Sequence, residues 1–355
     1  MSDATANAEH SSAADAQQPG GAAPAEPQPR EPRQRRAIAD LAAGDRLEDE
    51  TFLILQKDLR TTNNGGLYIH AVLGDHSGQL LSRMWNASRE IYASLPDHGV
   101  VHVRGRVESY KGRPQFIIDG VRAAEPGRID PSEFLPKSAH DVGEMWERVK
   151  RTLRTIRNPS LLALLAKFVN DEPFAESFRK APAARTNHHA YLGGLLEHTQ
   201  NLLALAEVVL PRYPRVSRDL VLAGLFLHDA GKTVELSYQN NFDYTDEGQL
   251  LGHVVQGAVW IAEKARQVEL DSGQPFPHDL LIALQHVIVS HHGRYEFGSP
   301  RLPATAEAIM VHYLDNLDAK LAMVFEAIDA DEEPQNDWTK WVPALETRVY
   351  KPYVT

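Results

Sequence analysis

A histidine and an aspartate stand side by side within an apolar stretch of the chain. Apolar residues at helical spacing between positions 219 and 230 place His228 on or near a buried face. The neighbouring Asp229 is a carboxylate, which is costly to bury unless it is paired or bound to a metal ion. Lys232 follows one turn after His228 on the same side. An isolated pair of this kind is more often structural than reactive, so its meaning depends on what accompanies it.

Further histidines and acids occur at buried positions of neighbouring segments that have helical periodicity. Five consecutive predicted helices, at 188–210, 219–230, 249–266, 277–290 and 304–327, contribute or lead into His198, His228, Asp229, His253, His291, His292 and Asp315. Imidazole and carboxylate donors without a thiolate suit Mn, Fe, Zn or Ni. The donors outnumber what one ion with open positions needs, so the sequence favours two divalent ions, with Asp229 bridging them through both oxygens.

Two bridged ions of this kind suit the cleavage of a phosphoester, because they make a nucleophile from water. Lys232 would then stabilise the charge that develops on the phosphoryl oxygens. The predicted catalytic residues are therefore Asp229 and Lys232, and the other donors are predicted metal ligands.

Composition limits the setting in which this site works. The chain has 355 residues, enough for two ordinary domains, and no cysteine, which excludes disulfides and thiolate ligands. No stretch approaches the ~18 apolar residues of a membrane span, and the N-terminus lacks the apolar segment of a signal peptide. We therefore expect a cytoplasmic protein with no membrane association. The net charge of -11 disfavours a broad basic surface that coats nucleic acid, but it is compatible with a local basic groove.

The first third of the chain divides into a tail and a strand-rich domain. Residues 1–36 contain no Leu, Ile, Val, Phe, Tyr or Trp, so we expect a disordered tail, which ends in a small arginine cluster. Residues 37–126 contain five short strand patterns and one helix, at 51–56, 67–74, 79–85, 88–95 (the helix), 100–109 and 115–121. Three strands, a helix and two strands predict an OB-fold barrel, which binds single strands by stacking bases on aromatic side chains. The candidate platforms are Tyr68, Trp85, Tyr110 and Phe116, and each of them could equally belong to the barrel core.

The rest of the chain has helical periodicity and no further strand pattern. A proline-containing linker at 127–140 precedes a predicted all-α domain at 141–335, and residues 336–355 form a C-terminal extension. The fold class predicted for the chain is thus multidomain α and β, with a small barrel followed by a helical domain. The first predicted helix buries one face and carries a run of arginines and lysines on the other, which is either a solvated face or a path for a strand.

The order His, His-Asp, His, His-His, Asp resembles the HD superfamily of metal-dependent phosphohydrolases. A closer resemblance, to the YhaM-type 3'-to-5' exoribonucleases, comes from the stretches HHAYLGGLLEHT at 188–199, SHHGRYEFGSP at 290–300 and YLDNLDAK at 313–320. That family joins an N-terminal OB-fold to a C-terminal HD domain, so the resemblance covers about 37–330. It implies a Mn-type metal requirement and stepwise release of nucleoside 5'-monophosphates from single-stranded RNA, and sometimes from single-stranded DNA.

The resemblance leaves several roles open. One of His291 and His292 could bind metal while the other faces substrate, and Asp318 could support a ligand from behind. Arg294, inside the second stretch, is expected to contact nucleic acid. Gly298-Ser299-Pro300 stands where the HD-GYP cyclic-dinucleotide hydrolases would have Gly-Tyr-Pro, which disfavours that group.

Two other functions compete with a nuclease. One is a phosphohydrolase of small nucleotides whose barrel serves regulation or assembly, and the other is an RNA-binding adaptor with a purely structural helical domain. The many buried polar groups argue against the adaptor, because a structural core has no need of them. A homo-oligomer is compatible with the sequence, which does not determine the oligomeric state.

Overall fold

The computed structural model describes residues 35–125, 129, 131–185, 189–238, 242–331 and 335–352. The predicted tail lies outside these residues, except for Arg35 and Arg36. His188, the first residue of the YhaM-like stretch at 188–199, also lies outside them. Within the described ranges, no helix combines the length and apolar character that crossing a membrane requires.

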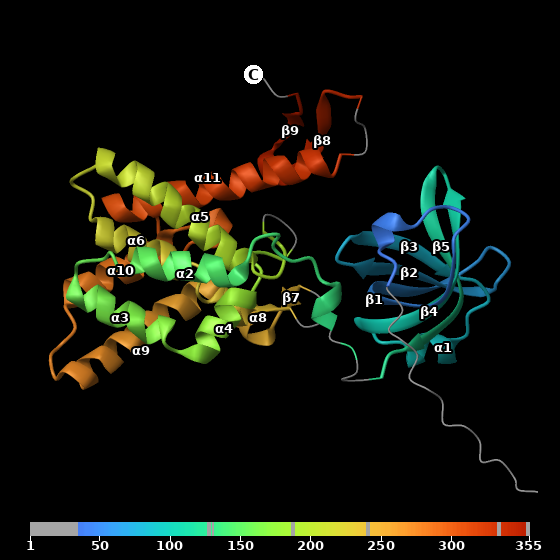
Figure 1. Cartoon of the computed structure of the whole chain (residues 1–355), viewed down its shortest axis with the longest axis horizontal. Helices are drawn as coiled ribbons and strands as arrows, with labels where there is room; N and C mark the ends of the chain where they lie inside the picture. Colours follow the sequence, from blue (N-terminus) through green and yellow to red (C-terminus); the bar gives the residue numbers. More distant parts are fainter. Residues whose placement is uncertain are drawn as a thin grey trace, which may run out of the picture. The chain divides into compact units, whose positions relative to one another are not determined.

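The first folded part is a closed five-stranded barrel (Figure 1). Its elements are β1 (Arg46–Thr61), β2 (Leu67–Asp75), β3 (Gly78–Met84), α1 (Arg89–Ser94), β4 (Gly99–Tyr110) and β5 (Arg113–Ala123), preceded by the 3-10 helix η1 (Ile38–Asp40). The strands close in the order β1-β2-β3-β5-β4, with α1 between β3 and β4, which is the OB-fold predicted from the sequence. Strand β1 pairs with both β2 and β4, and a register shift between Ile54 and Gln56 lets it bend from one partner toward the other.

Alternation along the strands builds the core of the barrel. On β4, Val101, Val103 and Val107 are buried while Arg104 between them is exposed. Phe116 of β5 is fully buried in the same core. Helix α1 starts at Ser88, whose hydroxyl accepts the backbone N–H of Ile91 at 3.2 Å.

The region predicted as a linker contains a short helix of its own. This is η2 (Pro131–Phe134), and Phe134 and the following Leu135 are buried against Leu53 and Val100 of the barrel. Part of the linker is therefore packed structure.

The second folded part is the predicted helical domain. Its helices are α2 (Val142–Leu153), α3 (Pro159–Val169), α4 (Glu172–Lys180), α5 (Gly194–Val209), α6 (Arg218–Leu227), α7 (Lys232–Glu235), α8 (Asp246–Leu250), α9 (Gly252–Ser272), α10 (His278–Ser290) and α11 (Ala306–Asp329). The 3-10 helices η3 (Leu210–Arg212), η4 (Tyr295–Phe297) and η5 (Pro343–Leu345) lie between or after them. Helix α5 packs against α2, α4, α6 and α11 around one continuous apolar core, so it holds a central place in this domain.

The helix ends follow local chemistry. Helices α2, α3, α4, α6, α8 and α11 begin after Asp141, Asn158, Asp171, Ser217, Thr245 and Thr305, whose side chains accept backbone N–H groups of the first turn.

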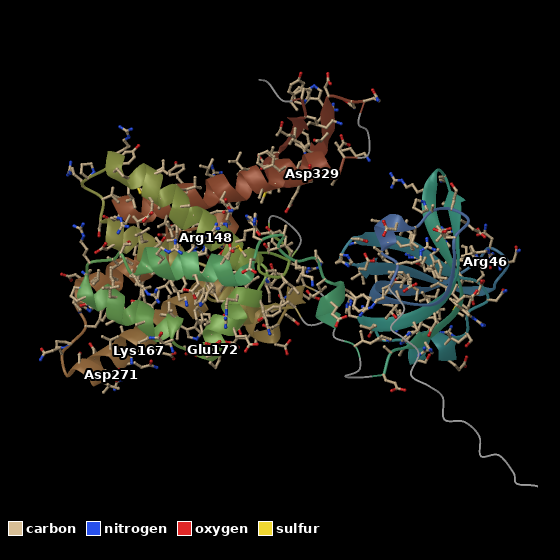
Figure 2. The ribbon with its side chains drawn as sticks, viewed as in Figure 1. Arg46, Arg148, Lys167, Glu172, Asp271 and Asp329 are labelled. Carbon is tan, nitrogen blue, oxygen red and sulfur yellow. The ribbon has the colours of Figure 1, made fainter. Side chains whose placement is uncertain are left out.

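Ion pairs join some of the helices at the surface. Lys167 of α3 forms an ion pair with Asp271 of α9 (Figure 2). On α2, Arg148 pairs with Glu144 at 3.4 Å, as expected for a solvated face.

Two predicted helix boundaries were wrong at glycines with a left-handed backbone, and the helix expected to end at 266 continues to Ser272. Helix α5 begins at Gly194 rather than at 188, because Gly193 has a φ of +82° and stands before the first turn. The single helix expected at 249–266 is two helices, α8 and α9, separated at Gly252, whose φ is +72°. Leu250, which the single helix would have turned inward, is 83% exposed.

The expectation that no strands follow the barrel was also wrong. Two small hairpins occur, β6 (Leu236–Ser237) with β7 (Asp243–Tyr244) and β8 (Trp338–Val342) with β9 (Thr347–Tyr350). These strands have two to five residues each, too few to display an alternating pattern.

Candidate metal centre and nucleic-acid surface

The His-Asp pair lies at the end of α6. His228 is the C-terminal cap of this helix, and its Nδ1 lies 2.9 Å from the carbonyl oxygen of Leu225. Because a carbonyl only accepts hydrogen bonds, Nδ1 carries a proton, and Nε2 is the ring nitrogen left to bind a metal ion. Both side chains are buried, at 0% exposure for His228 and 4% for Asp229.

A close approach of two backbones brings the next histidine to this pair. A Cβ on Gly231 would lie 2.3 Å from the carbonyl oxygen of His253, so only glycine permits this contact between the turn after α6 and the start of α9. The Nε2 of His253 consequently lies 3.4 Å from Oδ1 of Asp229. The sequence Leu-His-Asp-Ala-Gly therefore contributes two donors, His228 and Asp229. Its glycine also leaves room for a third donor, His253, to approach them.

One group of donors surrounds Oδ2 of Asp229. The Nε2 of His228 lies 3.4 Å from this oxygen and that of His198 lies 3.9 Å from it. Oδ1 of Asp315 lies 3.2 Å from the His198 Nε2 and 3.8 Å from the His228 Nε2. The two imidazole Nε2 atoms are 3.4 Å apart.

A second group of donors surrounds the other oxygen, Oδ1 of Asp229. The Nε2 of His253 lies 3.4 Å from it and the Nε2 of His291 lies 3.6 Å from it. The Nε2 of His292 is 3.2 Å from that of His253. The seven donors predicted from sequence thus meet at one place, divided between the two oxygens of a single carboxylate.

The donor set fits divalent metal ions. Oδ1 of Asp229 and Nε2 of His291 are buried and have no hydrogen-bond partner among the described residues, which is costly unless an ion occupies the space between them. Ligands ~2.1 Å from an ion lie roughly 3.0 to 3.5 Å from one another, which is close to the separations seen here. A purely structural cluster would instead pair each lone pair with a donor.

Charged neighbours set the ionisation of the carboxylate and the lysine. Burial raises the pKa of Asp229, but Lys232 and His228 outweigh this effect and hold the pKa well below its usual value. The Nζ of Lys232 donates to Oδ2 of Asp229 at 2.7 Å. Burial lowers the pKa of Lys232, and the attraction of Asp229 more than offsets it, so the pKa is raised. Both groups are therefore charged at neutral pH.

The two consecutive histidines have different surroundings. The Nδ1 of His291 donates to the carbonyl of Ile288 at 2.7 Å, and its imidazole is buried. His292 is less buried, and its Nδ1 has no hydrogen-bond partner among the described residues. Burial and the neighbouring His291 and His253 lower the pKa of His292 to about 2, so this imidazole is neutral and can act as a donor.

Several supporting residues lie behind the donors. Glu235 accepts the Nδ1 proton of His253 at 2.8 Å, and Asp318 accepts that of His198 at 2.7 Å, as the sequence had suggested for Asp318. Asp318 also lies 3.0 Å from Nε2 of His189, a residue in a left-handed backbone conformation with a φ of +55°. Such carboxylates orient the histidines that bind metals. Glu235 and His189 have no role predicted from the sequence, because neither has a spacing that relates it to the donors.

The predicted aromatic platforms divide into surface and core. Trp85 and Tyr110 are 43% and 47% exposed, and the Tyr68 ring centroid lies 5.1 Å from that of Trp85. The guanidinium of Arg83 lies 5.6 Å from the Trp85 ring and 5.1 Å from the Tyr110 ring. Phe116 was a wrong candidate, since its place in the core leaves no face for a base.

We call Tyr68, Arg83, Trp85 and Tyr110 the aromatic surface. Tyr68 belongs to β2 and Arg83 to β3, Trp85 directly follows β3, and Tyr110 is the last residue of β4. OB-folds use the face around β2 and β3 for oligonucleotides. Arg83 was absent from the sequence-based prediction, although its position two residues before Trp85 on one strand could have suggested it. Arg294, which was predicted to contact nucleic acid, lies outside the barrel and is exposed. Its guanidinium lies 5.8 Å from the Phe297 ring. Arg294 lies in the loop just after His292, and among the described residues its side chain forms no hydrogen bond or ion pair with the donors.

Comparison with known families agrees with the geometry. The family model of the HD domain matches residues 195–320. This stretch is an HD domain. It contains all seven donors and Lys232, and an HD domain indicates a metal-dependent phosphohydrolase and therefore a hydrolase. The order of histidines and acids along the chain is the feature that predicts this domain from the sequence.

Comparison with solved structures gives partial likenesses. The second OB-fold domain of replication protein A from Methanococcus maripaludis is 15% identical, with a TM-score of 0.22, over 27% of this chain and 100% of that one. A replication protein A heterotrimer bound to single-stranded DNA is 18% identical, with a TM-score of 0.18, over 26% of this chain and 71% of that one. The asparaginyl-tRNA synthetase of Entamoeba histolytica in complex with asparaginyl-adenylate is 16% identical, with a TM-score of 0.20, over 39% of this chain and 35% of that one. The OB-fold assignment rests on the strand order given above.

Proposed function

We propose that this protein is a metal-dependent 3'-to-5' exoribonuclease that releases nucleoside 5'-monophosphates from single-stranded RNA. The observation that carries the proposal is the division of donors around Asp229, whose Oδ2 faces His198 and His228 while its Oδ1 faces His253 and His291. A carboxylate used through both oxygens is typical of two-metal phosphoesterases. Mn fits the family resemblance, and Fe, Zn or Ni also fit the donors.

The residues of the centre have distinct roles in this proposal. His198, His228 and Asp315 would hold one ion, His253, His291 and His292 the other, and Asp229 both. When bound, two divalent ions would supply an activated water and would neutralise charge on the phosphodiester. Lys232, already fixed to Asp229 at 2.7 Å, would place its ammonium beside the phosphoryl oxygens.

Burial of the donors supports an unpaired strand as the substrate. The side chains of His198 and His228 are 1% and 0% exposed, and even Asp315 is only 17% exposed. A centre this enclosed admits a single strand end more readily than a duplex. The aromatic surface of the barrel would hold the preceding nucleotides by stacking, for which the Arg83 guanidinium provides added attraction.

The test compares substrates in parallel. Purified protein is incubated with labelled single-stranded RNA, single-stranded DNA and free nucleotides, in Mn and in chelator. We expect metal-dependent release of 5'-monophosphates from RNA, with weaker or equal action on DNA. Hydrolysis of free nucleotides without action on either strand would replace the proposal with a small-nucleotide phosphohydrolase.

A further inference from the structure

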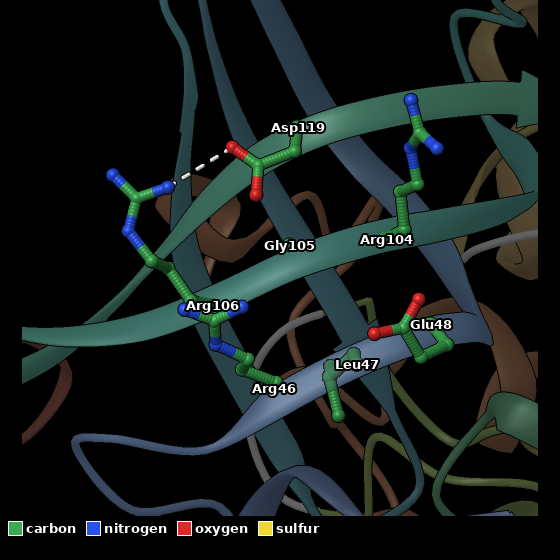
Figure 3. Close-up of a pocket in the computed structure, with 7 residues that line it drawn as sticks. All are labelled: Arg46, Leu47, Glu48, Arg104, Gly105, Arg106 and Asp119. Carbon is green, nitrogen blue, oxygen red and sulfur yellow. Dashed lines mark hydrogen bonds and ion pairs between the residues drawn. The ribbon is translucent and has the colours of Figure 1, made fainter.

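A second feature of the barrel is separate from the aromatic surface. A cavity of about 370 Å³ lies where β1, β4 and β5 run side by side (Figure 3). Its lining consists of Arg46, Leu47, Glu48, Arg104, Gly105, Arg106 and Asp119. We call this the arginine cavity. Three guanidinium groups and two carboxylates line it, so its charge is positive although the chain as a whole is acidic.

The arginines of the cavity are placed so that their like charges repel one another, which does not stabilise the barrel. Arg46 stands directly opposite Arg106 in the β1–β4 register, and Arg104 is two residues away on the same face of β4. Like charges directly opposite each other destabilise a sheet. The charge of Arg106 is compensated, because this residue pairs with Glu108 at 2.8 Å. It also pairs with Asp119 at 3.0 Å (Figure 3). Within the described part of the chain, the side chains of Arg46 and Arg104 form neither a hydrogen bond nor an ion pair.

The backbone of β5 makes room for one of these two arginines. A Cβ on Gly120 would lie 2.6 Å from Nε of Arg104 and 3.1 Å from its Cγ. The Arg104 side chain therefore lies flat across β5, where any larger residue would displace it. This contact limits the freedom of a long side chain before any ligand arrives, which lowers the entropic cost of binding.

We propose that the arginine cavity binds a phosphate group of a nucleic-acid strand through Arg46 and Arg104. Guanidinium groups present planar pairs of donors that match phosphate oxygens. A bound anion would also offset the repulsion between Arg46 and Arg106, which stand directly opposite each other. The proposal rests on the proposed function, because the phosphate is taken to belong to the single strand that the aromatic surface holds.

The position of the cavity on β4 is compatible with a continuous strand. Tyr110 lies four residues after Arg106, so alternation places both on the outward face of β4, roughly 13 Å apart. A strand stacked on the aromatic surface can follow this face to the cavity. Nucleotides outside the stacked ones would then be held by their phosphates, without preference for base.

The experiment measures binding of a fluorescent single-stranded RNA in chelator, so that no cleavage occurs. For the double variant Arg46→Ala with Arg104→Ala, we expect affinity about tenfold weaker at physiological salt, and a log–log salt slope shallower by about two. Arg122→Ala is the matched control, since Arg122 lies on neighbouring β5 outside the cavity and pairs with Asp49 at 3.1 Å. The control should bind nearly as the unaltered protein does.

A second arm uses inorganic phosphate as the probe and follows the unfolding temperature. Phosphate should raise the unfolding temperature of the unaltered protein more than that of the double variant. If strand binding and its salt slope are unchanged in the double variant while Trp85→Ala weakens binding, the cavity proposal is wrong and the aromatic surface stands. If the unaltered protein binds no strand but phosphate still stabilises it through Arg46 and Arg104, the cavity is an anion site and strand binding by the barrel is wrong. Equal response of both proteins to phosphate and to RNA overturns the cavity proposal.

Discussion

The carboxylate of Glu235 accepts two hydrogen bonds from a single residue, His253. Oε1 lies 2.8 Å from Nδ1 of the imidazole and 3.0 Å from the backbone nitrogen. This pairing keeps the proton on Nδ1 and turns Nε2 toward Oδ1 of Asp229, at 3.4 Å. Glu235 is therefore a positioning residue for a donor that would otherwise be free to rotate.

The first prediction concerns this positioning. Glu235→Ala should weaken metal binding by roughly 10- to 100-fold, because the His253 imidazole loses its fixed orientation and part of its basicity. Calorimetric titration of metal-free protein with Mn measures the change. Glu263→Ala, an exposed glutamate on the same α9 that carries His253, is the control. Equal affinity of the two variants would show that Glu235 does not position a ligand.

The second prediction concerns the bridging carboxylate. Asp229→Asn should abolish hydrolysis and lower metal content, since the substitution replaces one anionic oxygen and leaves only a neutral amide between the two groups of histidines. Binding of single-stranded RNA should persist, because in the proposed function the barrel and not the HD domain holds the strand. Metal analysis and RNA anisotropy on the same preparation measure both effects. Normal turnover with normal metal content in this variant would remove Asp229 from the centre.

The third prediction concerns pH and the metal-free protein. Burial favours neutral His198, but hydrogen bonds to Asp315 and Asp318 outweigh it and raise the pKa to about 9. This value lies above the pKa of ~6.5 of an unfolded histidine. Protonated His198 therefore makes its full contribution to the free energy of unfolding below about pH 6.5, and this contribution is lost as the pH rises through 9. In chelator, the free energy of unfolding should fall across this window by up to about 3 kcal/mol.

Urea unfolding at several pH values measures this slope. His198→Gln should remove most of it, because glutamine does not titrate. A slope that is identical in the variant would show that another group is responsible.

The fourth prediction concerns the aromatic surface. Trp85→Ala and Tyr110→Ala should each weaken binding of single-stranded RNA by about 1 to 3 kcal/mol, which is the usual contribution of one stacked base. Tyr213→Ala, which removes a 55% exposed aromatic residue from the helical domain, serves as the control. If all three variants bind alike, bases do not stack on this part of the barrel.

Much of the architecture was predictable because its signals are local. Turn residues and alternation located all five strands of the barrel, although β1 extends to Arg46–Thr61 instead of 51–56. The first residues of β1 mix charged side chains with the buried Leu47, so their alternation is hard to distinguish from a loop. The seven predicted donors could also be selected from the sequence, because each lies on the apolar stripe of a helix or directly after one, where a polar residue needs a reason.

The supporting residues were not predictable, because their roles depend on contacts between distant segments. His189 meets Asp318 across 129 positions, and Glu235 meets His253 only because Gly231 lets α9 approach. The boundary at Gly193 was missed for a related reason, since an apolar stripe continues through a glycine whether the backbone there is helical or left-handed. The arginine cavity likewise needs the register of β1 and β4, which no spacing within either strand reveals.

The central claim is that the HD domain removes nucleotides one at a time from a 3' end, and digestion of end-labelled RNA tests it most directly. Single-stranded RNA with a 5' label is incubated with the protein and Mn, alongside the same sequence closed into a circle and a copy with a blocked 3' end. We predict a ladder of progressively shorter labelled fragments from the linear strand, release of 5'-monophosphates, and resistance of both the circular and the blocked strands. Rapid cutting of the circle would show an endonuclease and contradict the claim.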